Sequence, residues 1–85
     1  MAKVTVYSGP NCPYCESAKA LLKKKGVAFE DFNVRKDPAK LDEMLQKSGG
    51  KKTIPQIFIN GQHIGGSDEL HALDAAGKLD ALLAQ

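Results

Sequence analysis

Cys12 and Cys15 are the two residues of this chain whose type and spacing most clearly suggest chemistry, and the chain has no other cysteine. Residues three apart on a helix share a face, with Cβ atoms about 5–6 Å apart, which is close enough for a disulfide. A bridge over so short a ring would stabilise the fold by only about 2 kcal/mol. Because it does so little as a structural link, the pair predicts a redox site that opens and closes.

The residues around the pair indicate how the fold would hold it. A β-branched and aromatic run at residues 4–7 predicts a strand, a loop follows at residues 8–11, and Pro13 suits the first turn of a helix. Cys12 then lies at a helix N-terminus, where free N–H groups and the helix dipole stabilise a thiolate. Such a setting lowers a cysteine pKa from about 8.5 to between about 3.5 and 7.5. We expect Cys12 to be the nucleophile and Cys15, one turn deeper, to be the resolving thiol.

Two helices and a second strand are expected in the first half of the chain. The helix after Cys12 should end at Gly26, and a strand should follow at residues 27–34. Asp37 and Pro38 provide a cap and a first-turn proline for the next helix. The expected buried stripe of that helix consists of Leu41, Met44 and Leu45.

A hairpin and two further helices are expected in the second half. Asn60-Gly61 is a strong two-residue hairpin signal, so residues 56–59 and 62–64 should pair antiparallel. Residues 67–69 open a helix that Ser67 is expected to cap, and a short helix completes the chain. The order βαβαββα plus a C-terminal helix predicts an α/β fold with a small mixed sheet and helices on its faces.

Length and composition exclude several classes of protein. With 85 residues the chain is expected to form one domain, residues 1–85. The net charge of +2 predicts neither nucleic-acid nor membrane binding, and no apolar stretch suits a signal peptide or a membrane span. Two cysteines without an export signal favour a reducing compartment, so a cytoplasmic location is expected.

Half of a zinc site is an alternative explanation for the cysteine pair. Zinc would need further ligands, and the remaining soft candidates are His63, on an expected strand, and His71, on an expected helix. Their spacing does not suit a zinc finger. We therefore favour the redox explanation and expect no metal.

Three segments of the chain agree in order and spacing with one known family. They are Cys12-Pro13-Tyr14-Cys15 after the first strand, residues 53–59 (Thr-Ile-Pro-Gln-Ile-Phe-Ile) and residues 65–68 (Gly-Gly-Ser-Asp). Over essentially its whole length the chain resembles a small bacterial dithiol glutaredoxin. The resemblance implies a thioredoxin-like fold with a four-stranded mixed sheet and helices on both faces. It also implies a monomeric glutathione-dependent disulfide oxidoreductase, which acts on glutathionylated or disulfide-containing proteins with glutathione as electron donor.

The resemblance further implies which residues bind glutathione. A cis Ile54–Pro55 bond would present the backbone of Ile54 to a thiol peptide. The helix start at residues 65–68 would receive the γ-glutamyl carboxylate, and Lys51, rather than Lys52, would receive the glycyl carboxylate. The complete set is Tyr14, Lys51, Thr53, Ile54, Pro55, Gly66, Ser67 and Asp68.

One departure and two rival functions remain open. Glutaredoxins commonly carry a lysine shortly before the first cysteine, where this chain has Gly9, so one expected cation is missing. One rival is a thioredoxin-like donor reduced by a flavoprotein reductase, against which the Cys-Pro-Tyr-Cys motif and the Gly-Gly-Ser-Asp segment argue. The other is a module that binds an iron–sulfur cluster between two subunits through Cys12 and glutathione, which Pro13 and Cys15 disfavour.

Overall fold

A four-stranded mixed sheet forms the centre of the structure, a computed structural model that describes residues 2–84. The strands lie in the order β2-β1-β3-β4. β1 runs parallel to β2 and antiparallel to β3, and β4 pairs antiparallel with β3. The predicted order of elements is confirmed. The strand bounds are β1 Val4–Ser8, β2 Phe29–Asn33, β3 Gln56–Ile59 and β4 Gln62–Gly65.

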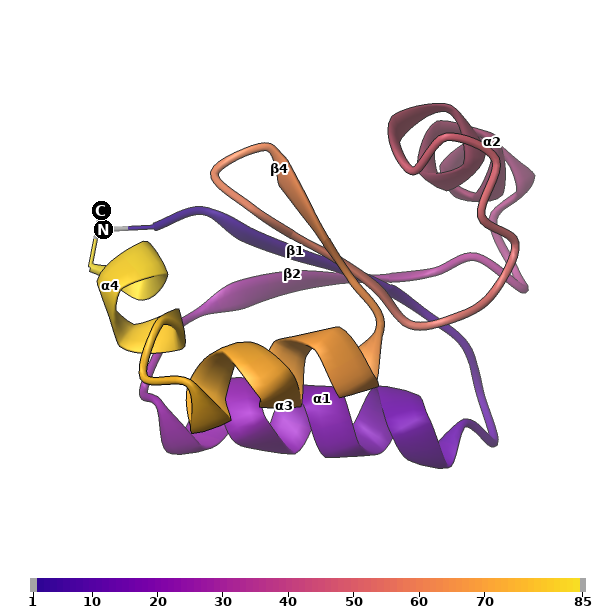
Figure 1. Cartoon of the computed structure of the whole chain (residues 1–85). Helices are drawn as coiled ribbons and strands as arrows, with labels where there is room; N and C mark the ends of the chain where they lie inside the picture. Colours follow the sequence, from indigo (N-terminus) through magenta and orange to yellow (C-terminus); the bar gives the residue numbers. More distant parts are fainter. Residues whose placement is uncertain (1, 85) are drawn as a thin grey trace.

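The helices cover the two faces of this sheet unequally. Figure 1 shows α1 and α3 side by side along one face, while α2 lies beyond one end of the other face. α4 follows α3 and lies at the opposite end of the sheet from α2 (Figure 1). None of the helices within residues 2–84 is long and apolar enough to cross a membrane. The helix bounds are α1 Pro13–Lys24, α2 Pro38–Lys47, α3 Ser67–Ala75 and α4 Leu79–Leu83.

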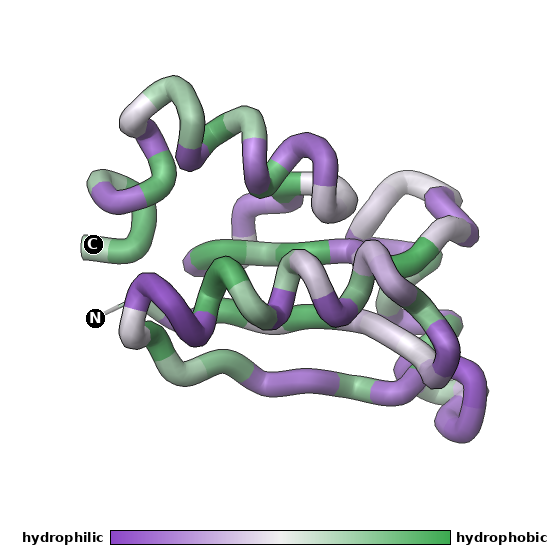
Figure 2. Tube along the Cα trace, turned by 90° about the horizontal axis from the view of Figure 1, so that it is seen from below, coloured by the Kyte–Doolittle hydropathy of each residue, from purple (hydrophilic) through white to green (hydrophobic). Residues whose placement is uncertain are grey.

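Two apolar clusters, one on each face, hold these layers together. The larger joins β1 and β3 to α1, α3 and α4, and the smaller packs α2 against the other face around Tyr7, Met44 and Phe58. In Figure 2 the hydrophobic colour covers much of the central strands and recurs on the helix drawn in front of them. Full burial of one large apolar side chain contributes about 1.5–3 kcal/mol, so the larger cluster fixes α1 firmly on the sheet. Its buried members are Val4, Val6, Ala18, Leu21, Leu22, Ile57, Ile59, Leu70, Leu79 and Leu83.

The second helix differs from its prediction. Of the expected stripe only Met44 is fully buried, Leu45 is half-buried, and Leu41 is 36% exposed. The reason is that α2 meets only the end of the sheet, so one turn of it reaches the core (Figure 1). The second strand is also shorter than predicted, because residues 27, 28 and 34 lie outside the pairing with β1.

Strand pairing brings the two loops of interest together. The hairpin between β3 and β4 is confirmed, with both Asn60 (φ 53°) and Gly61 (φ 81°) in the left-handed region that a two-residue turn requires. Tyr7, near the end of β1, pairs with Gln56, at the start of β3. Since these strands are antiparallel, the loop that leaves β1 toward Cys12 lies beside the loop that enters β3.

Candidate functional site

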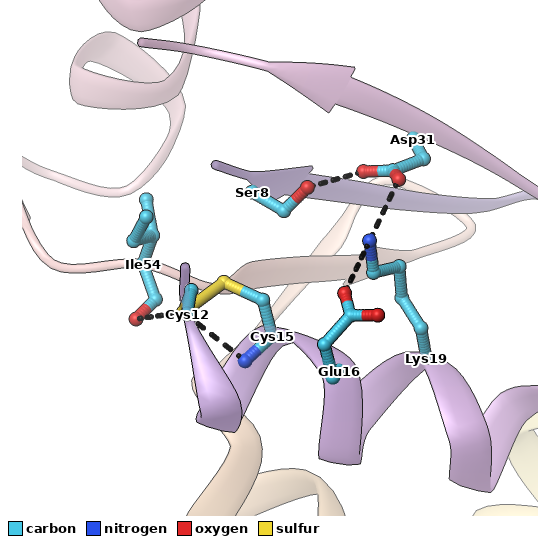
Figure 3. A network of polar contacts seen from close by, with 7 residues as sticks. All are labelled: Ser8, Cys12, Cys15, Glu16, Lys19, Asp31 and Ile54. Carbon is cyan, nitrogen blue, oxygen red and sulfur yellow. Dashed lines mark hydrogen bonds and ion pairs between the residues drawn. A yellow bond between two sulfur atoms is a disulfide. The ribbon is translucent and has the colours of Figure 1, made fainter. Parts of the chain in front are cut away.

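Cys12 and Cys15 form a disulfide at the start of α1, with their Cα atoms 5.2 Å apart. Cys12 is the N-cap residue, in an extended conformation, and its Sγ accepts a hydrogen bond from the backbone N–H of Cys15 at 3.1 Å (Figure 3). Asn11 turns the chain into this position with φ 55°, in the left-handed region, which asparagine tolerates better than most residues. The predicted placement of Cys12 at a helix N-terminus is confirmed.

The two sulfur atoms differ in their surroundings. The Cys12 side chain borders an open cleft and is only partly buried, whereas Cys15 is fully buried among the apolar residues of α1. An N–H group that already points at the Cys12 sulfur favours its anionic form when the disulfide is opened. The Cys12 sulfur is therefore accessible and stabilised by a hydrogen bond, whereas the Cys15 sulfur is buried directly behind it.

The loop before β3 supplies the backbone nearest to this sulfur. The Ile54–Pro55 peptide bond is cis, as the family resemblance implied. The carbonyl oxygen of Ile54 lies 3.9 Å from Cys12 Sγ (Figure 3). Pro55 is buried while Thr53 is exposed, so the loop faces the sulfur with its backbone and solvent with its threonine.

A cleft of about 340 Å³, called the α3 cleft below, lies between this loop, β4 and the start of α3. All eight residues expected to bind substrate line it, although they come from three separate segments of the chain. Tyr14, on the first turn of α1, is 65% exposed at its edge. The eight are Tyr14, Lys51, Thr53, Ile54, Pro55, Gly66, Ser67 and Asp68.

Three residues of the α3 cleft are not predicted from the sequence as part of the site. They are Gln56, His63 and Glu69. The sequence places Gln56 on a strand and suggests His63 only as a zinc ligand or a surface residue. The one available signal is position, because Gln56 directly follows Pro55 and Glu69 directly follows the Gly-Gly-Ser-Asp segment.

The cap of α3 corrects the prediction for Ser67. The N-cap residue is Gly66, whose backbone N–H donates to the Glu69 carboxylate at 3.0 Å, and Ser67 is already the first helical residue. Ser67 is instead buried, with its carbonyl oxygen 2.8 Å from Nδ1 of His71. The N–H groups of Ser67 and Asp68, at the first turn of α3, have no hydrogen-bond acceptor within residues 2–84, and both residues line the α3 cleft.

A second cleft, called the β2 cleft below, lies on the other side of Cys12 and contains a polar network (Figure 3). Lys19 Nζ is 3.0 Å from a carboxylate oxygen of Glu16 and 3.0 Å from one of Asp31. The other oxygen of Asp31 accepts the hydroxyl of Ser8. The pKa of Lys19 is raised, chiefly by its hydrogen bond to Glu16, so the ammonium group stays charged. The network links α1 to β1 and β2.

Gly9, the departure from the family pattern, lies against a cation from elsewhere in the chain. A Cβ atom at Gly9 would lie 2.7 Å from Cγ of Arg35 and 3.0 Å from Cδ1 of Ile54. The backbone of Gly9 is not in the left-handed region, so contact with these side chains, rather than backbone strain, limits substitution. Arg35, from the loop after β2, thus fills the space beside Gly9.

Neither histidine stands in a metal-binding arrangement. Within residues 2–84, no three residues of the types His, Cys, Asp and Glu are grouped closely enough to hold a metal ion. His63 instead hydrogen-bonds Gln56 at 2.7 Å, and His71 lies between Ser67 and Ser17.

Comparisons with known proteins agree with this geometry. The glutaredoxin family model matches residues 4–64. The chain is 54% identical to glutaredoxin 3 of Escherichia coli (strain K12) over 83 residues, which covers 98% of this chain and 99% of that protein.

Solved structures agree as well and confirm the thioredoxin-like fold. The solution structure of glutaredoxin from Brucella melitensis has a TM-score of 0.83 and 48% identity, covering 98% of this chain and 89% of that one. A crystal structure of a buckwheat glutaredoxin–glutathione complex has a TM-score of 0.87 and 30% identity, and the match covers 98% of this chain and 77% of that one.

Proposed function

The chain belongs to the glutaredoxin family of thiol-disulfide oxidoreductases, and we propose that it reduces protein–glutathione mixed disulfides and protein disulfides with glutathione as electron donor. The observation that carries the proposal is the position of Cys12. Its sulfur caps α1, accepts the N–H of Cys15, and is only partly buried, next to the cleft-lining loop at Ile54.

For a mixed disulfide, the Cys12 thiolate attacks the sulfur of the glutathionyl group. The bond between that sulfur and the target protein breaks, the protein leaves as a thiol after taking up a proton, and Cys12 carries the glutathionyl group. A second glutathione then attacks this sulfur as a thiolate, which releases glutathione disulfide and restores the Cys12 thiolate. One protein thiol and one glutathione disulfide form for each glutathione consumed.

For a protein disulfide, both thiols take part. Cys12 attacks one sulfur of the target, and Cys15 then attacks Cys12 to release the target as a dithiol. Two glutathione molecules reduce the resulting Cys12–Cys15 disulfide and leave as glutathione disulfide. Burial of Cys15 behind Cys12 supports this division, because a foreign disulfide can reach only the outer sulfur.

The α3 cleft supports binding of glutathione through its two charged ends. The free N–H groups at Ser67 and Asp68 suit the γ-glutamyl carboxylate, and the Asp68 carboxylate suits the adjacent ammonium group. Lys51 and Thr53, across the cleft, suit the glycyl carboxylate. The similar buckwheat glutaredoxin forms a crystallised complex with glutathione, which supports the same ligand here.

A coupled assay tests the proposal. A glutathionylated peptide is offered as substrate, and electrons are supplied either by glutathione with glutathione reductase or by a thioredoxin reductase system. We expect turnover in the first system and little in the second. Turnover only with thioredoxin reductase would replace the proposal with the thioredoxin-like alternative, and a coloured, cluster-bearing dimer on purification would favour the iron–sulfur module.

Three further expectations accompany the proposal. A cytoplasmic location suits a cysteine pair that must be reduced again after each cycle. Action as a monomer and a single domain over residues 1–85 stay predictions. Gel filtration and limited proteolysis of the full chain would test the last two.

A further inference from the structure

The side chains of Thr53, Gln56 and His63 form a connected series of hydrogen bonds next to the loop before β3. The side-chain nitrogen of Gln56 lies 2.9 Å from the carbonyl oxygen of Thr53 and 3.0 Å from its hydroxyl oxygen. The side-chain oxygen of Gln56 lies 2.7 Å from Nε2 of His63. Gln56 is only 3% exposed, so water cannot readily replace these partners, and losing them would leave a buried amide without hydrogen bonds.

The sheet itself places these groups on one face. Successive residues of a strand point to opposite faces, so Gln56 and Phe58 share the face away from α1. His63, on β4, pairs directly with Phe58, and their rings lie 4.9 Å apart. His63 therefore stands over Phe58 with its Nε2 directed at the amide of Gln56.

The acceptors around Gln56 determine the direction of each hydrogen bond that joins Thr53, Gln56 and His63. A carbonyl oxygen can only accept, so the group of Gln56 facing Thr53 must be its NH₂. The oxygen of Gln56 then faces His63, and Nε2 of His63 must carry a proton in order to donate. The Thr53 hydroxyl oxygen, in turn, accepts from Gln56, which leaves its own O–H available as a donor.

We propose that His63 and Gln56 are positioning residues that hold the Thr53 hydroxyl as a hydrogen-bond donor for the glycyl carboxylate of the substrate. Thr53 is exposed and lines the α3 cleft together with Lys51, so an ammonium group and a directed hydroxyl converge on one anionic end. Without Gln56 the hydroxyl could rotate freely and the loop at Thr53 would lose two hydrogen bonds. The inference rests on the proposed use of glutathione.

The first test needs no substrate. Nitrogen NMR of the imidazole, at a pH where the ring is neutral, distinguishes the two tautomers of His63. We expect the proton on Nε2, and a ring protonated mainly on Nδ1 would contradict the inference. Because this measurement uses the protein alone, it stands even if the protein proves not to use glutathione.

The second test compares two glutamine substitutions in the glutathionylated-peptide assay. Gln56→Met keeps the length and burial of the side chain but cannot donate, and Gln62→Met, at an exposed position of β4, is the matched control. We expect Gln56→Met to raise KM about 3- to 10-fold, the factor for one hydrogen bond, with kcat and the pKa of Cys12 unchanged. Gln62→Met should leave all three values unchanged.

A double substitution shows whether the effect passes through the hydroxyl. Thr53→Val removes the hydroxyl and keeps the shape of the side chain. In that background Gln56→Met should raise KM by clearly less than it does alone. An unchanged KM in the single variant, or fold-changes that simply multiply, would overturn the inference, whereas a wild-type protein inactive on the glutathionylated peptide would overturn the proposed function itself.

His63 provides variants that do not disturb the buried strand. His63→Phe keeps the stacking on Phe58 but removes the donor, and His63→Gln restores a donor. We expect KM to rise about 2- to 3-fold in the first and to return toward the wild-type value in the second. Equal values for both variants would contradict the positioning by His63, even if Gln56→Met fails to fold.

Discussion

The two clefts beside the disulfide use their charges in opposite ways. In the β2 cleft, Lys19 is bound by Glu16 and Asp31, and its side chain is only 18% exposed. In the α3 cleft, neither Lys51 nor Asp68 forms an ion pair within residues 2–84. Charges that neutralise one another hold elements in place, whereas an unpaired cation and anion facing one cleft suit a ligand that carries both charges.

The same difference extends to the backbone. The backbone N–H of Cys15 donates to the Cys12 sulfur, whereas the N–H groups of Ser67 and Asp68, two residues that line the α3 cleft, have no acceptor within residues 2–84. One helix N-terminus therefore stabilises a reacting atom of the protein, and the other is free for an anion from outside. The comparison predicts that changes in the α3 cleft alter substrate use, whereas changes in the β2 cleft alter stability.

The largest expected effect comes from removing the sulfur of Cys12, which lies between the two clefts. Cys12→Ser should abolish activity, because the chain has no other accessible thiol. Cys15→Ser should retain reduction of glutathione mixed disulfides and lose the two-thiol reduction of protein disulfides. Both variants are assayed on a glutathionylated peptide and on a protein disulfide, and equal loss on the glutathionylated peptide would show that the roles are assigned wrongly.

The next effect concerns the unpaired anion of the α3 cleft. Asp68→Ala should weaken use of a glutathionylated peptide by about 1–3 kcal/mol, the range for a lost hydrogen bond to a charged group. Thermal stability should change less, because Glu69 still caps α3 at Gly66. Asp42→Ala, at an exposed position on α2, is the control for charge alone, and equal kinetics in the two variants would reduce Asp68 to a surface residue of the helix start.

A smaller effect is expected in the β2 cleft, and on stability only. Lys19→Met should lower the free energy of unfolding by less than about 1 kcal/mol, because its ion pairs are partly exposed, and should leave KM unchanged. The raised pKa of Lys19 gives the sign of the pH dependence. Its contribution is complete below the unfolded-state value of 10.5 and is lost as the pH rises through the folded-state pKa.

Chemical denaturation at several pH values measures this contribution. The stability difference between wild type and Lys19→Met should shrink above about pH 10.5. A difference that stays constant to high pH would mean that Lys19 acts through the packing of its aliphatic stem. A change of KM in this variant would contradict the division between the two clefts.

The smallest effect tests the missing cation before Cys12. Gly9→Lys should lower the pKa of Cys12 and tighten the glutathionylated substrate, each by less than about 1 kcal/mol and less at high salt. The side chain of Arg35 must first move aside, so folding is checked by circular dichroism. The rate of reaction with iodoacetamide, followed as a function of pH, measures the pKa of the Cys12 thiol. A folded variant with unchanged kinetics and acidity would indicate that Arg35 or Lys51 already supplies the cation.

Local signals account for the parts of the site that the sequence predicted well. Pro13 and Asn11 fix the turn that makes Cys12 a helix cap, and Asn60-Gly61 fixes the hairpin. Each depends on the backbone dihedral angles and hydrogen bonds of a few neighbouring residues. The helix cap at Ser67 was wrong for a similar local reason, since glycine one residue earlier serves equally well when Glu69 reaches back to its N–H.

The sequence by itself therefore determined which residues carry the chemistry and which short elements hold them. Only the tertiary structure decided which of them meet: the His63–Gln56–Thr53 chain, the pairing of Lys19 with Asp31, and the exposure of Leu41. These contacts depend on strand order and register and on where α2 meets the end of the sheet. Periodicity shows which side of an element is apolar, but the neighbour that covers that side is fixed by long-range packing.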